Sequence, residues 1–133
     1  MMEKFREMAI LFDKWMTIKE KKINLIDEYF GNEAYRIGIY GYGKIGRHIV
    51  HEIELSKSSV LWIADQRAND IKGIEYTVVL PDRIKVEPDY TLVTAIEDQE
   101  KIEKNIMDCI NTRIIFIGDM IEAVFNESTH NMQ

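Results

Sequence analysis

Three closely spaced glycines at the end of an apolar segment constrain this fold more than any other feature of the sequence. They occupy the pattern G-x-G-x-x-G and are Gly41, Gly43 and Gly46. The segment before them, 35–40, is a short apolar run that predicts a strand. After them, isoleucines recur every four residues from Ile45 to Ile53, which predicts an amphipathic helix over 44–55. The sequence therefore predicts a strand that turns tightly into a helix.

The rest of the chain continues this alternation of strands and helices. Apolar runs predict four more strands, over 59–64, 75–80, 90–95 and 113–117. Helical spacing predicts a helix over 97–110, with Glu97 and Asp98 in its first turn. This alternation predicts an α/β fold, a Rossmann-like parallel sheet of about five strands in the order 3-2-1-4-5, flanked by helices. The connection 65–74 is too short for a full crossover helix and leaves the topology there open.

Helical signals near the two ends divide the chain into three parts. We expect an N-terminal helical extension (1–33), a Rossmann-like nucleotide-binding domain (34–125) and a polar tail (126–133). Asp119 and Glu122 have capping-box spacing, so they predict the start of a last short helix that runs through Phe125. The polar tail is expected to fray.

The N-terminal extension itself predicts two helices. In the first, over 2–21, one apolar stripe at helical spacing contains Phe5, Met8, Phe12, Trp15 and Met16. Asn24 can cap a second short helix, which Gly31 can end. The stripe must cover either the edge of the sheet or a second copy of the chain, and the second alternative predicts a homodimer through the N-terminal helices.

Composition excludes several classes of partner. The net charge is −6 and the basic residues form no stripe, so the chain is poorly suited to bind nucleic acid. No run approaches the ~18 apolar residues that a membrane span needs, so we expect no membrane insertion. The single cysteine, Cys109, suits a reducing compartment, and the N-terminal residues show no signal-peptide pattern. These features predict a soluble, cytoplasmic protein.

The glycine turn also predicts a kind of ligand. Gly41 permits the tight turn, Gly43 lets backbone approach a pyrophosphate, and Gly46 lets the helix pack close to the sheet. Unpaired amides and the helix dipole favour an anion at the start of the helix. The candidate phosphate-binding residues are therefore Gly41, Tyr42, Gly43, Lys44, Ile45 and Gly46. The alternative is that the glycines only make a tight turn and nothing binds there.

Three further residues are candidates for the rest of a nucleotide. Asp65 ends the second predicted strand, where it can accept hydrogen bonds from ribose hydroxyls or serve as a turn or cap acid. Arg67 suits the 2′-phosphate of NADP instead, so the cofactor is NAD or NADP, with a nucleotide sugar as the alternative. Thr94 ends the fourth predicted strand, and its hydroxyl can contact a ligand or cap the next helix.

Other combinations of reactive residues give weaker signals. Tyr40 and Lys44 have the spacing of a short-chain dehydrogenase pair, but they fall on a strand and beyond a turn instead of on one helix. His48 and His51 share a helix face, yet no third metal ligand lies near them in the sequence. Cys109 has no histidine partner and is expected to be a buried small apolar residue. The sequence therefore predicts no catalytic residue and no metal site.

Several stretches of the chain resemble a known group of proteins. They are the segments 37–47, 62–68 and 88–95, together with the helix pair that ends at Phe30. With these residues the chain resembles the small Rossmann-like modules of bacterial surface-polysaccharide biosynthesis. Such modules occur alone or fused to glycosyltransferases and are similar to the C-terminal domain of sugar C-methyltransferases. The resemblance implies an NAD(P)- or nucleotide-sugar-binding module with a partner protein in a glycan pathway, and it transfers no catalytic residue.

The sequence leaves four functions as alternatives. The first is a nucleotide-binding module without a complete active site, because only the cofactor half of a site is visible. The second is an oxidoreductase or sugar-modifying enzyme that is completed across an oligomer or by a partner. The third is a regulatory nucleotide sensor, and the fourth is a scaffolding domain with a vestigial glycine turn.

Overall fold

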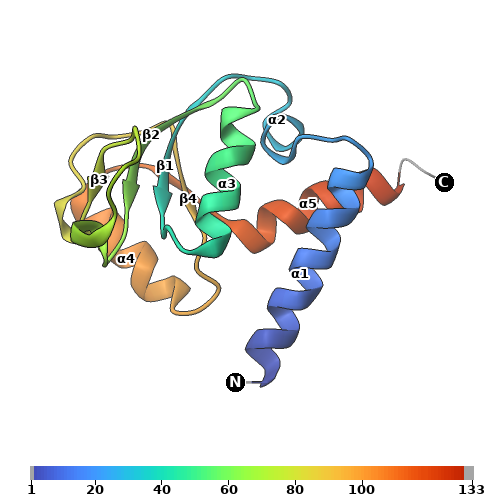
Figure 1. Cartoon of the computed structure of the whole chain (residues 1–133), viewed down its shortest axis with the longest axis horizontal. Helices are drawn as coiled ribbons and strands as arrows, with labels where there is room; N and C mark the ends of the chain where they lie inside the picture. Colours follow the sequence, from blue (N-terminus) through green and yellow to red (C-terminus); the bar gives the residue numbers. More distant parts are fainter. Residues whose placement is uncertain (1, 131–133) are drawn as a thin grey trace.

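The five strands form one parallel sheet in the computed structural model, which describes residues 2–130 (Figure 1). The strands are β1 (Arg36–Tyr40), β2 (Ser59–Ala64), β3 (Val78–Val79), β4 (Tyr90–Val93) and β5 (Arg113–Phe116). Their order is β3-β2-β1-β4-β5, and every neighbouring pair is parallel. The predicted fold class and strand order are therefore confirmed.

The centre of the sheet positions the glycine turn. Tyr40, the last residue of β1, pairs with Ala64 at the end of β2 and with Val93 at the end of β4. The carboxyl ends of these three strands therefore lie level with one another. From there the chain leaves β1 toward β2, and it leaves β4 toward β5 on the other side. This divergence between β1 and β4 is the switch point at which open α/β sheets bind ligands.

Helices cover both faces of the sheet. The helices are α1 (Met2–Glu20), α2 (Leu25–Tyr29), α3 (Lys44–Glu54), α4 (Gln99–Cys109) and α5 (Ile117–His130). One hydrophobic cluster joins α1, α2, α3 and α5 to one face, and a second joins α4 to the other. Side chains of β1 alternate between the two, since Ile37 and Ile39 belong to the first cluster and Tyr40 to the second. Figure 1 shows α1 crossing α5 on the side away from β3.

The N-terminal helices share the core of the sheet domain. Asn24 caps α2 by accepting hydrogen bonds from the amides of Ile26 and Asp27, as predicted. The buried carboxylate of Glu52 on α3 accepts a hydrogen bond from the Leu25 amide at 3.1 Å and pairs with Lys19 at 2.6 Å. One side chain of α3 therefore ties together the end of α1 and the start of α2.

The predicted apolar stripe of α1 is wrong in its direction. Of its five residues only Trp15 is buried, whereas Phe5 and Met16 are 65% and 43% exposed. The face that packs on the rest of the molecule contains Leu11, Trp15 and Ile18. The predicted stripe mixes Trp15 of this inner face with Phe5 and Met16 of the neighbouring face, because a pattern of apolar residues alone does not say which of two neighbouring faces is covered.

The starts of the two last helices also differ from prediction. Helix α4 begins at Gln99, so Glu97 and Asp98 precede its first turn, and Asp98 has a left-handed backbone at φ 56°. Helix α5 begins at Ile117, directly after β5, so Asp119 lies inside the first turn instead of capping it. Helix α5 therefore starts where β5 ends, whereas α4 starts only after the left-handed residue Asp98.

Two element lengths differ as well. Helix α5 continues to His130, five residues beyond the predicted end at Phe125, so the segment 126–130 of the predicted polar tail is helical. Residues 131–133 of that tail, and Met1, lie outside the described residues. The third strand is only Val78–Val79 instead of 75–80, and it is reached from β2 through a single short turn at Ala68–Asp70. No full crossover helix forms there, in agreement with the length of the connection.

Candidate functional site

The turn between β1 and α3 explains two of its three glycines by geometry. Gly41 has φ +103°, a conformation that side chains with a Cβ rarely adopt. A Cβ on Gly46 would overlap the carbonyl oxygen of Gly41, because the first turn of α3 packs directly on the end of β1. Both glycines are therefore required by the tight strand-to-helix turn that the sequence predicts.

Gly43 differs from the other two glycines. It has extended backbone angles, φ −84° and ψ −155°, and a Cβ built on it would meet nothing within 4 Å. It is the N-cap residue of α3, and no side chain caps this helix end. The first amides of an α-helix have no partner within the helix, and the helix dipole places partial positive charge at them. The space beside Gly43 is therefore open to an anionic group.

The carboxylate of Asp65 holds this corner in place through hydrogen bonds to the backbone. Its Oδ2 accepts a hydrogen bond from the Tyr42 amide at 2.7 Å, and its Oδ1 accepts one from the Arg67 amide at 2.7 Å. Arg67 also brings its Nε within 3.8 Å of Oδ1. Of the two predicted roles, the structure shows the turn acid. A carboxylate has about four acceptor positions, so these bonds leave capacity for ligand hydroxyls, and the ribose role stays a prediction.

Thr94 ties β4 to the glycine turn. Its hydroxyl lies 3.1 Å from the carbonyl oxygen of Tyr40 and 2.9 Å from that of Gly41, and it donates to them. The side chain is buried and would collide with a Cβ on Gly41. Of the two predicted roles, the helix cap is not formed, because the hydroxyl faces back toward β1 and α4 begins only after Asp98, and the ligand contact stays a prediction.

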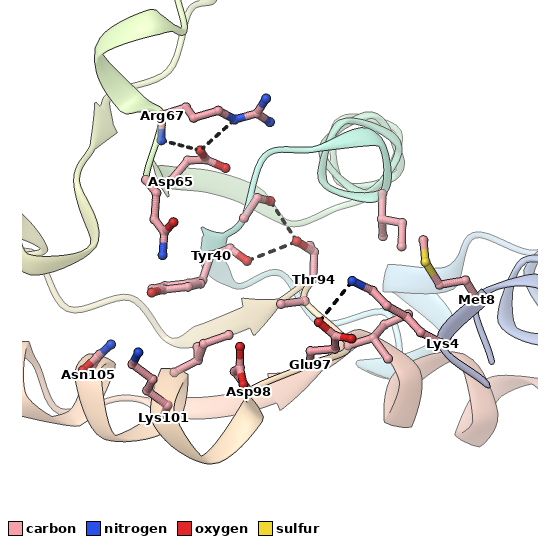
Figure 2. Close-up of a pocket in the computed structure, with 16 residues that line it drawn as sticks. Lys4, Met8, Tyr40, Asp65, Arg67, Thr94, Glu97, Asp98, Lys101 and Asn105 are labelled. Atoms are coloured by element: carbon pink, nitrogen blue, oxygen red, sulfur yellow. Dashed lines mark hydrogen bonds and ion pairs between the residues drawn. The ribbon is translucent and has the colours of Figure 1, made fainter. Parts of the chain in front are cut away.

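A pocket of about 510 Å³ lies at the carboxyl edge of β1, β2 and β4 (Figure 2). Its volume is within the range of small-molecule sites. The lining residues come from the ends of these strands, from α1 and from α4. They are Lys4, Met8, Tyr40, Gly41, Ile45, Asp65, Gln66, Arg67, Thr94, Ala95, Ile96, Glu97, Asp98, Lys101, Ile102 and Asn105.

The predicted site residues divide into two groups around this pocket. Those that line it are Gly41, Ile45, Asp65, Arg67 and Thr94. Those of the turn that do not line it are Tyr42, Gly43, Lys44 and Gly46. Within the second group, the Tyr42 ring lies under the guanidinium of Arg47 at 5.6 Å, and Lys44 is exposed. One side of the turn, at Gly41 and Ile45, therefore faces the pocket. Gly43 lies outside the pocket lining, on a side of the turn that is open to solvent.

Sequence reasoning missed the walls that α1 and α4 provide. Lys101 and Asn105 share one face of α4 through their four-residue spacing, a signal that could have been noticed once the helix was predicted. Lys4 reaches the pocket from α1 and pairs with Glu97 at 3.1 Å. Nothing local in the sequence indicates this contact, because it depends on how α1 packs.

Tyr40, the last residue of β1, contributes a phenol to the lining of the pocket. Burial raises the pKa of this phenol above 10, the charges of Asp65 and Cys109 add to the rise, and the side chain of Asn105 opposes it. The phenol therefore stays protonated at neutral pH and can serve as a hydrogen-bond donor to a ligand. Figure 2 shows Tyr40 between Asp65 on one side and Lys101 and Asn105 on the other.

The charges around the pocket are balanced. Three cationic side chains, Lys4, Arg67 and Lys101, meet three anionic ones, Asp65, Glu97 and Asp98. Lys4 and Arg67 are paired with acids of the same pocket. Among residues 2–130, no group of three or more His, Cys, Asp or Glu side chains is arranged to hold a metal ion. The group at this edge that is best suited to an anion is therefore the N-terminal end of α3 and not a cluster of cations.

Cys109 lies away from the opening of the site. It is half-buried, and its thiol lies 3.7 Å from the carbonyl oxygen of Pro81. The side chain packs against the cluster under α4, which agrees with the predicted apolar role, and its burial is partial.

Comparisons of the chain with protein families, curated proteins and solved structures gave no significant match. In the described part of the chain, no helix combines the length and the apolar character needed to cross a membrane. The functional conclusion therefore depends on the geometry of the β1–α3 corner and the pocket beside it.

Proposed function

We propose that this chain is a nucleotide-binding module, which takes NAD, NADP or a nucleotide sugar and has no complete active site of its own. The observation that carries the proposal is Gly43. Neither its backbone angles nor its surroundings require glycine, and it caps α3 without any side chain. A missing side chain at this position is useful when a diphosphate must approach the helix amides.

The position and size of the pocket support the same class of ligand. It begins at Gly41 and Ile45, next to the N-terminal end of α3, and continues past Thr94 to Asn105 on α4. A diphosphate at the N-terminal end of α3 would leave one nucleotide half near Asp65 and the other toward Lys101 and Asn105 on α4. Asp65 retains acceptor capacity for ribose hydroxyls, while Lys101 and the Tyr40 phenol offer donors on the opposite wall.

The proposed role in surface-polysaccharide biosynthesis rests on the resemblance of residues 37–47, 62–68 and 88–95 to modules of that pathway. Within it, a module without its own chemistry would hold a nucleotide for a partner enzyme. The Tyr40 phenol supports the non-catalytic form of the proposal. A general base works best with a pKa near the working pH, and burial moves the pKa of Tyr40 further above it.

A thermal-shift experiment with a panel of ligands tests the proposal. The panel contains NAD, NADP, ADP-ribose and UDP-sugars. A ligand at about 100 times its Kd stabilises the native state by about 2.7 kcal/mol, which raises the Tm by several degrees. We expect one class of the panel to raise the Tm and the others to leave it unchanged, which identifies the nucleotide.

The matched variant is Gly43→Val. A Cβ at this position meets no other atom within 4 Å, so the variant should fold, with a Tm without ligand that is lowered only by the weaker N-cap residue. The ligand-induced rise should disappear. A rise of the same size in Gly43→Val would place the ligand elsewhere, and a wild type that responds to no nucleotide would refute the proposed function.

A further inference from the structure

Helix α1 has a second apolar face that the protein covers only at Phe12, whose ring lies 6.2 Å from the ring of His48 on α3. The residues on it repeat at alternating steps of three and four: Met2, Phe5, Ala9, Phe12 and Met16. Met2, Phe5 and Met16 are 85%, 65% and 43% exposed, Ala9 is exposed, and Phe12 is half-buried. Alternation of three and four is the spacing of the seam in a two-helix coiled coil. We call these five residues the outer seam.

The outer seam is distinct from the face that packs on the protein. The inner face repeats with the same spacing through Met8, Leu11, Trp15 and Ile18, and its last two residues are buried. At 100° per residue, the two faces lie roughly 120° apart around the helix. The N-terminal end of α1 projects beyond the other elements in Figure 1, and the most exposed seam residues, Met2 and Phe5, lie at this end.

Charges beside the outer seam differ from those beside the inner face. Lys4, Lys14 and Lys19 each form an ion pair with an acid elsewhere in the chain. Arg6 and Asp13 directly follow the seam residues Phe5 and Phe12, and neither forms an ion pair with any residue from 2 to 130. A partner that covers the seam between Phe5 and Met16 would thus meet one positive and one negative charge, seven residues apart; Glu20, a further seven residues along, lies beyond the last seam residue.

We propose that the outer seam pairs with the same seam of a second copy of this chain, antiparallel to it, and forms a two-fold symmetric dimer. In this arrangement Phe5 lies opposite the Met16 position of the second copy, and Ala9 lies opposite its Phe12 position. A small residue then faces a large one in the central layers, which suits close packing. An interface with two-fold symmetry requires one surface that complements itself, and this seam fulfils that condition.

The charges select the antiparallel direction. In the register above, Arg6 of each copy comes within about 3 Å, along the helix axis, of the level of Asp13 in the other copy, at 1.5 Å per residue. Both copies contribute the same pair, so two ion pairs flank the seam. In a parallel pair, Arg6 and Asp13 of one copy would instead lie beside Met8 and Trp15 of the other copy. Those two residues are uncharged and belong to the inner face, so no opposite charge would meet Arg6 or Asp13.

The test is the mass of the full chain in solution, measured by sedimentation equilibrium as a function of concentration. The interface is small, so we expect the mass to rise from 15.6 kDa toward twice that value as the concentration increases. Phe5→Arg should hold the mass at 15.6 kDa at every concentration with an unchanged circular dichroism spectrum. The matched control is Leu55→Arg, at an apolar side chain of similar exposure (63%) directly after the end of α3, which should still associate.

A charge exchange then tests the direction of pairing. Arg6→Asp and Asp13→Arg should each weaken association, and the double variant should restore it, because opposite charges then meet again. Loss in all three variants would contradict the antiparallel register. A wild-type chain that remains at 15.6 kDa up to millimolar concentration would overturn the dimer itself. Neither result depends on the proposed nucleotide, because the measurement is made without ligand.

Discussion

At the scale of single residues, Gly43 and Gly46 occupy the same helix end under opposite constraints. The first turn of α3 presses Gly46 against the carbonyl oxygen of Gly41, whereas Gly43 faces open space. A stability measurement can therefore separate the glycine that the fold requires from the glycine that the proposed ligand requires. No other pair of positions in the turn offers this contrast with the same change of residue.

We expect Gly46→Ala to lower the free energy of unfolding by about 2 kcal/mol, because the added methyl group forces the helix away from β1. Gly43→Ala should lower it by no more than about 1 kcal/mol, because the new methyl group meets no other atom and only the N-cap preference for glycine over alanine is lost. Denaturant unfolding followed by circular dichroism measures both. Equal destabilisation of the two variants would show that the turn needs both glycines for packing.

The sequence predicts the turn between β1 and α3, but it does not predict the hydrogen bonds that hold this turn in place. The spacing of Gly41, Gly43 and Gly46 between a strand and a helix is a local pattern, so it predicts the turn. Besides its neighbour Arg67, Asp65 bonds to Tyr42, 23 residues away, and the partners of Thr94 lie 53 and 54 residues away. Which of several chemically allowed partners such a side chain takes depends on three-dimensional placement, and the sequence therefore left their roles open.

At the scale of elements, one hydrogen bond fastens the long connection after β2 to helix α3. The phenol of Tyr76 donates to Oε2 of Glu54 at 2.6 Å. The connection has only a single short turn of its own at Ala68–Asp70, so contacts of this kind hold it in place before β3. Burial, the hydrogen bond to Glu54 and the charge of that carboxylate raise the pKa of Tyr76 from 10.0 to about 12.

This pKa predicts a pH dependence of stability at the alkaline end. The native state favours the protonated phenol, so its contribution is complete below about pH 10 and is lost as the pH rises toward about 12. We expect Glu54→Gln to lower the pKa of Tyr76 toward 10, although burial remains. Absorbance titration of tyrosinate, with Tyr76→Phe to assign the signal, measures the shift. Identical titrations of the wild type and Glu54→Gln would contradict the role of Glu54.

Elements with a strong local period were predicted well, and those fixed by packing were not. The strand at 59–64 and the helix cap at Asn24 follow from an apolar run and a capping side chain. The inner face of α1 did not follow, because two apolar faces on one helix compete and α5 covers only one. The end of α5 at His130 likewise exceeds what its polar last turn indicates.

At the scale of the whole molecule, the sheet brings its strand ends and three helices to one edge. The glycine corner supplies the helix end, β2 and β4 supply Asp65 and Thr94, and α1 and α4 form the walls of the pocket. The sequence predicts the strand order and hence the position of this edge. It does not predict the wall from α1, because Lys4 and Met8 reach the pocket only through the docking of that helix.

The most direct measurement of the central claim is a nucleotide titration followed by the backbone amide signals of the isotope-labelled chain. If the N-terminal end of α3 holds the diphosphate, the amide signals of residues 43–46 should shift and reach saturation as nucleotide is added. The amide signals at the end of β4 should shift with the same midpoint. Signals on the far end of α5 stay in place. Shifts that avoid residues 43–46, or none with any of the nucleotides, would contradict the account.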